Sequence, residues 1–297
     1  MPNVVEGKTK KVIPIRAARF VSKDDLTAGD GKKHDILPGK GELATRTTVH
    51  VFELLRHCGL PVAYIAQDSP TSFIGYECTM VPLEVVVRRE AHGSFLKRSL
   101  AHTKGDRFET PKVEFYLKTK GRRFREHDLP CDDPYMVIVR DEVRLYRPDE
   151  TIVPEAPFLT VRYVDVFGEF ENDYNLWSPD DLAGEAVRAF LILETAWQKL
   201  ERRLVDFKLE FGVLDDGTSD PPTLIADVID NDSWRLMQGD DYVDKQVYRD
   251  GGDLEKVLKN YRRVADMTGR FRTLRESIRT ATMDAIVRPT YEPCYRT

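Results

Sequence analysis

The sequence predicts an α+β protein, folded as one large domain or as two modest ones. Its 297 residues are enough for either organisation. Two segments place apolar residues at helical spacing, and several short runs rich in Val, Ile and Phe lie between polar turns, as strands do. Because both kinds of segment occur along the chain, the mixed class is favoured over an all-helical or all-strand fold.

Strands and turns dominate the first part of the chain. Apolar pairs at 4–5 and 12–13 flank a polar turn at 7–10. Apolar residues at helical spacing predict a helix over about 47–58. The β-branched run at 81–87 predicts a strand.

The middle of the chain, about 119–178, mixes charges, prolines and short apolar patches. We interpret it as strands with long surface connections and as a candidate insertion. Ser178 then caps a predicted helix, with a proline directly after the cap. Its apolar stripe comprises Ala186, Ala189, Phe190, Leu193, Ala196, Trp197, Leu200 and Leu204.

A charged strand follows this helix. Residues 206–212 alternate charged and apolar side chains, and 223–229 form a second predicted strand after a turn-rich stretch. A hairpin that closes symmetrically pairs Leu214 with Thr223 and sets Glu210 opposite Asp227. The alternative is an exposed pair in which each carboxylate attracts a lysine.

Asp227 is the one charge within the apolar run 224–229. Burying a lone carboxylate costs several kcal/mol, of the order of 2–7, unless it is paired or bound to a metal. We therefore favour a metal held by the two facing carboxylates. Mg²⁺ suits this arrangement, because it takes one or two carboxylates together with nucleotide phosphate oxygens.

The composition excludes several classes of protein. With 45 basic and 50 acidic residues the net charge is −5, without a basic patch interleaved with aromatics, so we expect no nucleic-acid partner. The apolar stretches are too short for a membrane span, and the N-terminus does not resemble a secretory signal. Four scattered cysteines are typical of reduced thiols, and we expect a cytoplasmic protein.

Eight blocks, in order and with similar spacing, resemble the SAICAR synthetases (phosphoribosylaminoimidazole-succinocarboxamide synthases). The blocks are 6–10, 22–29, 39–41, 80–84, 88–98, 206–212, 227–236 and 244–250. The run 227–235 resembles the animal-type branch, in which the synthase is fused to a carboxylase, and we expect no carboxylase within these 297 residues. The middle region matches the family poorly.

The resemblance implies a two-lobed fold related to kinases and ATP-grasp enzymes, with ATP in the cleft. The expected lobes are residues 1–83, rich in strands, and residues 84–297, a larger α+β body. It also implies an ATP-dependent ligase of de novo purine biosynthesis, which condenses L-aspartate with carboxyaminoimidazole ribotide to give SAICAR, ADP and phosphate. ATP and Mg²⁺ are the implied cofactors, the partners are small-molecule substrates, and self-association is left open.

The same resemblance assigns site residues. The nucleotide-binding set is Gly7, Lys8, Lys10, Met80, Glu84 and Lys118. The catalytic set is Lys208, Glu210 and Asp227, of which Glu210 and Asp227 are the metal ligands. The substrate-binding set is Arg88, Ser94, Lys97, Asp232, Arg235, Lys245 and Arg249. A glycine lets backbone N–H groups approach phosphate, and arginine offers a planar fork for phosphate or carboxylate.

Alternatives stay open for these assignments. The turn at 7–10, taken alone, is more typical of a solvated hairpin. Without the flanking Gly93 and Ser94, Arg88 with Arg89 would be equally typical of surface charges that close a strand. At the level of function, the rivals are a related ATP-dependent enzyme acting on another carboxylate or amine, and an inactive binding relative that keeps the fold.

Overall fold

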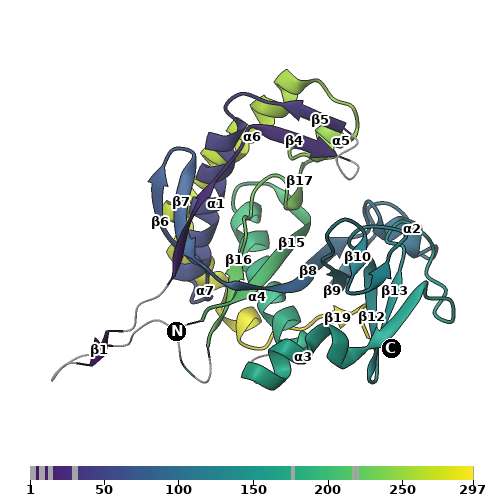
Figure 1. Ribbon diagram of the computed structural model, residues 1–297. Coiled ribbons are helices and arrows are strands. Elements are labelled where there is room, and N and C mark those ends of the chain that lie inside the picture. The colour runs from purple at the N-terminus through teal and green to yellow at the C-terminus, as the bar shows by residue number, and fades with distance from the viewer. Residues whose placement is uncertain are drawn as a thin grey trace.

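The structure is a computed structural model that describes residues 5–6, 11–12, 16–28, 33–174, 178–215, 218 and 221–296. Within these residues, the largest element is a ten-stranded sheet (Figure 1). In spatial order its main path is β14 (Leu159–Arg162), β13 (Glu142–Tyr146), β12 (Tyr135–Val139), β9 (Arg107–Leu117), β8 (Thr79–Glu90), β15 (Arg203–Val213), β17 (Trp234–Gln238) and β18 (Asp241–Tyr242). Two further strands attach at its sides, β16 (Thr223–Ala226) on β15 and β19 (Glu292–Pro293) on β9.

Smaller antiparallel sheets surround it. They are β3 (Ala17–Val21) with β7 (Ser72–Tyr76) and β6 (Tyr64–Ser69); β4 (Asp25–Ala28) with β5 (Lys33–Ile36); β1 (Val5–Glu6) with β2 (Lys11–Val12); and β10 (Arg123–Phe124) with β11 (His127–Asp128). Strands β1 and β2 pair as the sequence predicted for the segments that flank 7–10. The turn itself lies outside the described residues.

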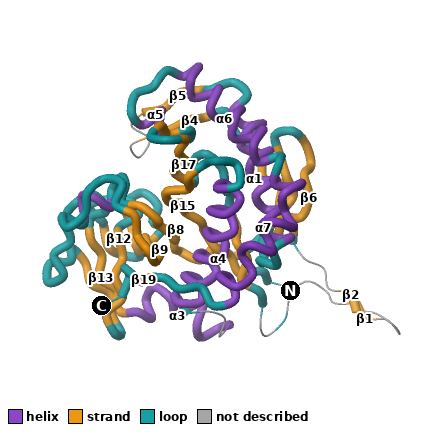
Figure 2. Tube along the Cα trace, turned by 180° about the vertical axis from the view of Figure 1, so that it is seen from behind, coloured by secondary structure: helices purple, strands orange, loops and turns teal. Residues whose placement is uncertain are grey.

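Helices cover one side of the large sheet (Figure 2). Those of the described chain are α1 (Lys40–His57), α2 (Phe95–Arg98), α3 (Tyr163–Tyr174), α4 (Pro179–Gln198), α5 (Gln246–Arg249), α6 (Leu254–Thr268) and α7 (Phe271–Val287). Helix α4 packs on β15, β8 and β9, α7 packs on α4, and α1 packs on α6 and α7. The main core lies between these helices and the sheet. None of the helices described has the length and apolar character that crossing a membrane needs.

The predicted cap of α4 is confirmed. The Ser178 hydroxyl accepts a hydrogen bond from the Asp181 N–H at 3.3 Å, and the Asp181 carboxylate accepts one from the Ser178 N–H at 2.8 Å. The predicted stripe is buried, but its last two members are placed wrongly: α4 ends at Gln198, Leu200 lies in the turn that follows, and Leu204 lies in β15. The chain reverses at Glu201, which has a positive φ of 58°. Apolar spacing alone could not reveal this turn.

The other predicted elements are present with different bounds. The helix over 47–58 begins earlier, at Lys40, because its first turn is too polar to show the apolar period. The middle region does hold strands, β10 to β14, but also the helix α3, which was not predicted. Strand β8 runs without interruption through residues 83 and 84, the expected lobe boundary, so one rigid strand carries both Met80 and Arg88.

Candidate active site

The hairpin formed by β15 and β16 corrects the predicted register by one residue. Val213, not Leu214, pairs with Thr223, and Glu210 pairs with Ala226, not Asp227. The Leu214 N–H donates to the carbonyl of Pro222 at 3.0 Å, which continues this shifted register by one residue. If β16 continued beyond Ala226, this shift of one residue would place the Asp227 side chain on the opposite face of the sheet from Glu210. Instead β16 ends at Ala226.

Asp227 follows β16 with a positive φ of 59°, a left-handed conformation that redirects the chain. The negative charge of Asp227 contributes to raising the pKa of Glu210, although burial is the largest cause. Strand register does not set the two residues opposite each other, because Asp227 lies in the turn that follows β16.

Lysines and carboxylates from three neighbouring strands surround this pair. Lys208 Nζ on β15 lies 2.8 Å from Glu84 Oε2 on β8. Lys118 Nζ, directly after β9, lies 3.4 Å from Glu210 Oε1 and 3.1 Å from Asp133 Oδ2. Glu210 therefore attracts a lysine, as in the alternative, but its side chain is only 15% exposed, so this is not the exposed pair that the alternative described. The metal at Glu210 and Asp227 stays a prediction.

Burial shifts the pKa values of the two carboxylates and of Lys208 in different ways. Burial raises the pKa of Glu210 and of Asp227 against the lowering effect of Lys118 and Lys208. Burial lowers the pKa of Lys208, but Glu84 more than reverses this, so the ammonium stays charged. The raised pKa values mean that the protein alone stabilises the ionised forms of these carboxylates poorly. A bound divalent cation would stabilise both ionised forms. The described residues hold no cluster of three or more metal-ligating side chains, so the remaining ligands would come from phosphate and water.

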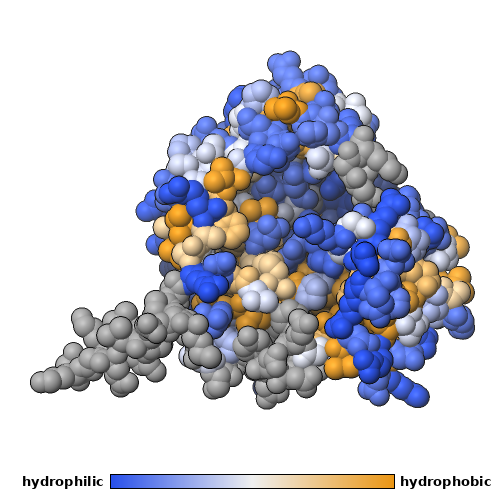
Figure 3. Space-filling view, in the orientation of Figure 1, coloured by the Kyte–Doolittle hydropathy of each residue, from blue (hydrophilic) through white to orange (hydrophobic). Residues whose placement is uncertain are grey.

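A first cavity of about 180 Å³ opens between these strands and the loops that follow them. It is lined by Glu84, Val86, Arg88, Ser94, Tyr116, Asp206, Phe207, Lys208, Asp232, Ser233, Trp234, Arg235 and Arg249. Seven of these were predicted as site residues. Figure 3 shows the surface hollowed on this side, with hydrophilic residues around the hollow.

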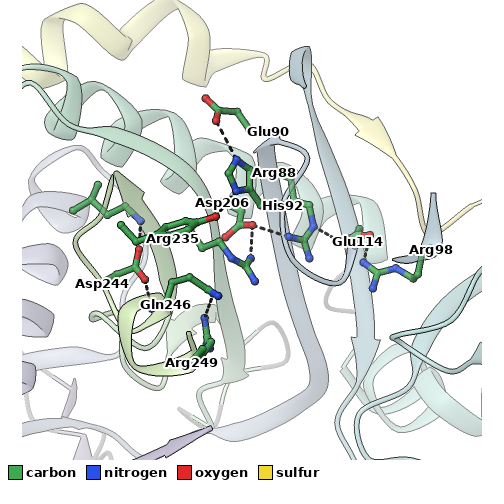
Figure 4. A network of polar contacts seen from close by, with 12 residues as sticks. Arg88, Glu90, His92, Arg98, Glu114, Asp206, Arg235, Asp244, Gln246 and Arg249 are labelled. Carbon is green, nitrogen blue, oxygen red and sulfur yellow. Dashed lines mark hydrogen bonds and ion pairs between the residues drawn. The ribbon is translucent and has the colours of Figure 1, made fainter. Parts of the chain in front are cut away.

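A buried carboxylate, Asp206, orients two of the cavity's arginines (Figure 4). Its Oδ2 lies 2.6 Å from Nη1 of Arg88 and 2.7 Å from Nη1 of Arg235. Arg88 also donates from Nε to Glu114, which binds Arg98 from the other side at 2.5 Å. The guanidinium groups are thereby held in fixed orientations, which suits them to bind an anion through several hydrogen bonds.

The backbone at Gly93 makes room for Arg235. Gly93 has a φ of +58°, and a Cβ placed there would lie 2.2 Å from Arg235 Nη2. A side chain at this position is therefore excluded twice, by the left-handed backbone and by the guanidinium. Ser94 follows at the start of α2 and lines the cavity.

A second cavity of about 320 Å³ lies against the first. Asp227, Val228, Asp230 and Asp232 line one side of it, and Phe20, Val21, Ser22, Lys23, Asp25, Lys40, Ala44 and Phe73 line the other. Asp232 lines both cavities.

Asp232 has several cationic and hydroxyl partners. Its Oδ2 lies 3.0 Å from Nζ of Lys245 and 3.4 Å from Nζ of Lys40, and the Tyr261 hydroxyl donates to its Oδ1. Burial raises its pKa, but Lys245 and Lys40 outweigh burial and hold it below the usual value.

Some predicted residues are not brought into either cavity. Lys97 is exposed on α2, and Met80 is 41% exposed near the start of β8. Lys245 reaches the site through Asp232. Gly7, Lys8 and Lys10 lie outside the described residues.

Asp206, Glu114 and Lys40 are among the residues of the site that were not predicted. Asp206 shares the charged strand face with Lys208 and Glu210, so alternation could have found it. Glu114 is the one charge in the short run 113–117, but the same strand also carries Arg107, Glu109 and Lys112, so the signal that singled out Asp227 is weaker here. Lys40 stands between two glycines, a pattern with no single meaning on its own.

Comparisons with known proteins identify the family of the chain. The family model for SAICAR synthetase matches residues 3–137 and 177–268, which leaves most of the middle region unmatched. A phosphoribosylaminoimidazole-succinocarboxamide synthase from Roseiflexus sp. (strain RS-1) is 37% identical over 89% of this chain and 95% of its own length. The bifunctional carboxylase/synthetase of Drosophila melanogaster is 36% identical over 89% of this chain and 56% of its own length.

Solved structures show the same fold. A SAICAR synthetase in complex with ADP is 28% identical, with a TM-score of 0.63 over 90% of this chain and 97% of that one. A synthase from Ehrlichia chaffeensis is 26% identical, with a TM-score of 0.64 over 89% of this chain and 97% of that one. From the family model, the relatives and the shared fold, this chain belongs to the SAICAR synthetase family.

Proposed function

We propose that this protein uses ATP to join the amine of L-aspartate to the carboxylate of carboxyaminoimidazole ribotide, giving SAICAR, ADP and phosphate in de novo purine biosynthesis. Family membership supports this reaction. The observation that carries it is the first cavity, where Arg88, Arg235 and Arg249 surround one small space with Ser94. A ribotide that bears a phosphate and a carboxylate needs such a set of directed donors.

The nucleotide is assigned to the side of the site that holds Glu84, Lys118, Glu210 and Asp227. The similar structure bound to ADP supports nucleotide binding here. Lys118 and Lys208 face these carboxylates and supply positive charge for phosphate. Mg²⁺ held by Glu210 and Asp227 would neutralise charge on the phosphates.

The chemistry needs no nucleophile from the protein. A carboxylate oxygen of the ribotide forms a bond to the γ-phosphorus of ATP, the bond from that phosphorus to the β–γ bridging oxygen breaks, and ADP leaves with the electron pair. The neutral amine of aspartate then bonds to the acyl carbon, the bond to phosphate breaks, and the nitrogen loses one proton to solvent. The protein's task is to position the groups and to balance charge, which Lys208 and the arginines do.

We also propose that the protein is cytoplasmic. Cys58, Cys78, Cys131 and Cys294 are all free thiols in the structure, as expected for a protein of a reducing compartment.

The test is ADP release by the purified protein with Mg²⁺, ATP and aspartate, with and without the ribotide. We expect ADP formation only with all components, together with a product of the mass of SAICAR. Saturable ATP binding without turnover would instead favour the related ligase that acts on another carboxylate.

A further inference from the structure

The segment 39–41, Gly-Lys-Gly, forms a rigid start to α1. Gly39 has a φ of +86°, and the Asp24 carboxylate accepts hydrogen bonds from the N–H groups of Gly39 at 3.1 Å and Gly41 at 2.8 Å. A Cβ at Gly41 would lie 2.9 Å from the carbonyl oxygen of Ser22. Both glycines are thus required by the turn and by close packing, and together they hold Lys40 between them.

Lys40 lies where the two cavities meet. It is only 6% exposed, yet it lines the second cavity together with Asp227. Its Nζ is 3.4 Å from Asp232 Oδ2, and Asp232 also lines the first cavity. The Lys40 ammonium therefore contacts a carboxylate that both cavities share, one cavity holding Asp227 and the other the arginines assigned to the ribotide.

Asp232 does not need Lys40 to be satisfied. Lys245 lies closer to the same oxygen, at 3.0 Å, and the Tyr261 hydroxyl donates to the other oxygen. The neighbouring Asp230 is a weak counter-charge, since burial raises its pKa to about 7. Two lysine side chains thus share one carboxylate, which leaves positive charge available to an anion in the cavity.

We propose that Lys40 is a catalytic residue of the ligase, whose ammonium contacts the phosphoryl group as it passes from ATP to the ribotide carboxylate. This inference rests on the proposed function. Lys40 forms and breaks no covalent bond and keeps its proton throughout. It offsets the negative charge of the transferred group while one phosphorus–oxygen bond forms and the other breaks.

The test compares Lys40→Met, Lys40→Arg and Tyr261→Phe in the ADP-release assay. We expect kcat to fall about 100-fold in Lys40→Met, the usual loss when one stabilising donor is removed from a transition state. Lys40→Arg keeps the charge and should recover to within about tenfold of the parent. Tyr261→Phe removes a partner of Asp232 but no charge, and should change kcat less than about threefold.

Two further measurements separate chemistry from folding. The Kd for ADP should change less than about threefold in Lys40→Met, because the charge acts on the group in transfer. Thermal unfolding should show that Lys40→Met is folded, because Asp232 is still paired with Lys245 in this variant. If Lys40→Met does not fold, Lys40→Gln is measured in its place, with the same expected loss of kcat.

A kcat of Lys40→Met within about fivefold of the parent would overturn the inference, because a transition-state contact costs more than that. An equal loss in Tyr261→Phe would also overturn it, since Lys40 would then act only through Asp232. A parent protein that forms no SAICAR would remove the proposed function and this inference together. Parental turnover with an unaffected Lys40→Met would remove the inference alone.

Discussion

The substrate arginines owe their positions to buried carboxylates. Asp206 is shared by Arg88 and Arg235, and Glu114 by Arg88 and Arg98. With each carboxylate serving two guanidinium groups, the arginines are oriented without being fully neutralised. This arrangement leaves charge for an anionic ligand and avoids the entropy cost of ordering a flexible side chain at the moment of binding.

Gly93→Ala should weaken ribotide binding. The new Cβ would displace the Arg235 guanidinium, whose Nη2 would lie 2.2 Å away. We expect KM for the ribotide to rise about 10- to 100-fold, because a misplacement of roughly 1 Å costs about that much. Steady-state kinetics with the ribotide as the varied substrate measure this effect.

Gly239→Ala is the matched control. Gly239 has the same φ of +58° but nothing within 4 Å of an added Cβ. Both variants should therefore lose about 1 kcal/mol of stability or more from backbone strain, but only Gly93→Ala should alter KM. Equal KM values in the two variants would contradict the steric role of Gly93.

The pleating of the neighbouring strands β8 and β15 brings the site residues onto one face of the sheet. Glu84, Val86 and Arg88 on β8 line the cavity at every second residue, as do Asp206 and Lys208 on the adjacent β15. Because β8 and β15 are hydrogen-bonded neighbours, with Arg88 opposite Asp206 and Glu84 opposite Glu210, one sheet face presents both the arginine and the lysine–carboxylate clusters.

Glu114 on β9 connects β8 to α2, and its loss should destabilise the protein. It is buried, which raises its pKa, but Arg88 and Arg98 overcome burial and lower the pKa to about 2. The stabilisation is therefore complete above the ordinary value of 4.5 and is lost as pH falls towards 2. Glu114→Gln should lose about 3–5 kcal/mol at neutral pH, since two buried arginines would lose their shared partner.

Urea unfolding between pH 7 and pH 2 measures both effects of Glu114. The parent should lose stability across the acid range, and Glu114→Gln should lack this component. Glu142→Gln is the control, because Glu142 is 51% exposed beside Arg144. A Glu114→Gln protein with the parent's acid profile would show that other carboxylates dominate it.

The second cavity joins parts of the chain far apart in sequence. Ser22 and Lys40 come from the region of β3 and α1, whereas Asp227 and Asp232 follow β16. A ligand bound there would contact both regions at once. It should therefore stabilise the whole molecule against unfolding, by an amount that its concentration and Kd determine.

ADP with Mg²⁺ should raise Tm, and Asp227→Asn should abolish most of the increase. At a hundredfold excess over Kd the gain is about 2.7 kcal/mol for the parent. Without ligand, Asp227→Asn should be at least as stable as the parent, because burial raises the pKa of Asp227 and thus disfavours its charge in the fold. Differential scanning calorimetry with and without ADP and Mg²⁺ tests both statements.

Asp241→Asn is the control, because Asp241 is an exposed carboxylate on β18 and its variant should keep the full increase in Tm. An undiminished increase in Tm in Asp227→Asn would count against the role of Asp227 as a ligand.

Local sequence patterns were sufficient for several features. The cap at Ser178, the strand within 79–90 and the charged face of β15 depend on neighbours a few residues apart, so period and cap chemistry predict them. The family blocks also pointed to seven residues that now line one cavity. Helix α3 was not predicted, because the charges and prolines of the region around it were interpreted as surface connections, although Tyr163, Val166 and Phe167 do recur at helical spacing.

Long-range features were decided only by tertiary structure. The pairing of β16 with β15 is shifted by one residue from the symmetric hairpin, and Asp227 lies in a left-handed turn after β16. The sharing of Asp206 by two arginines, and of Asp232 by two cavities, joins residues up to about 200 positions apart, such as Lys40 and Asp232. The sequence by itself determined which residue types and elements were available. Which of them meet depended on strand pairing and packing, because those contacts are set by the whole chain and not by neighbours along it.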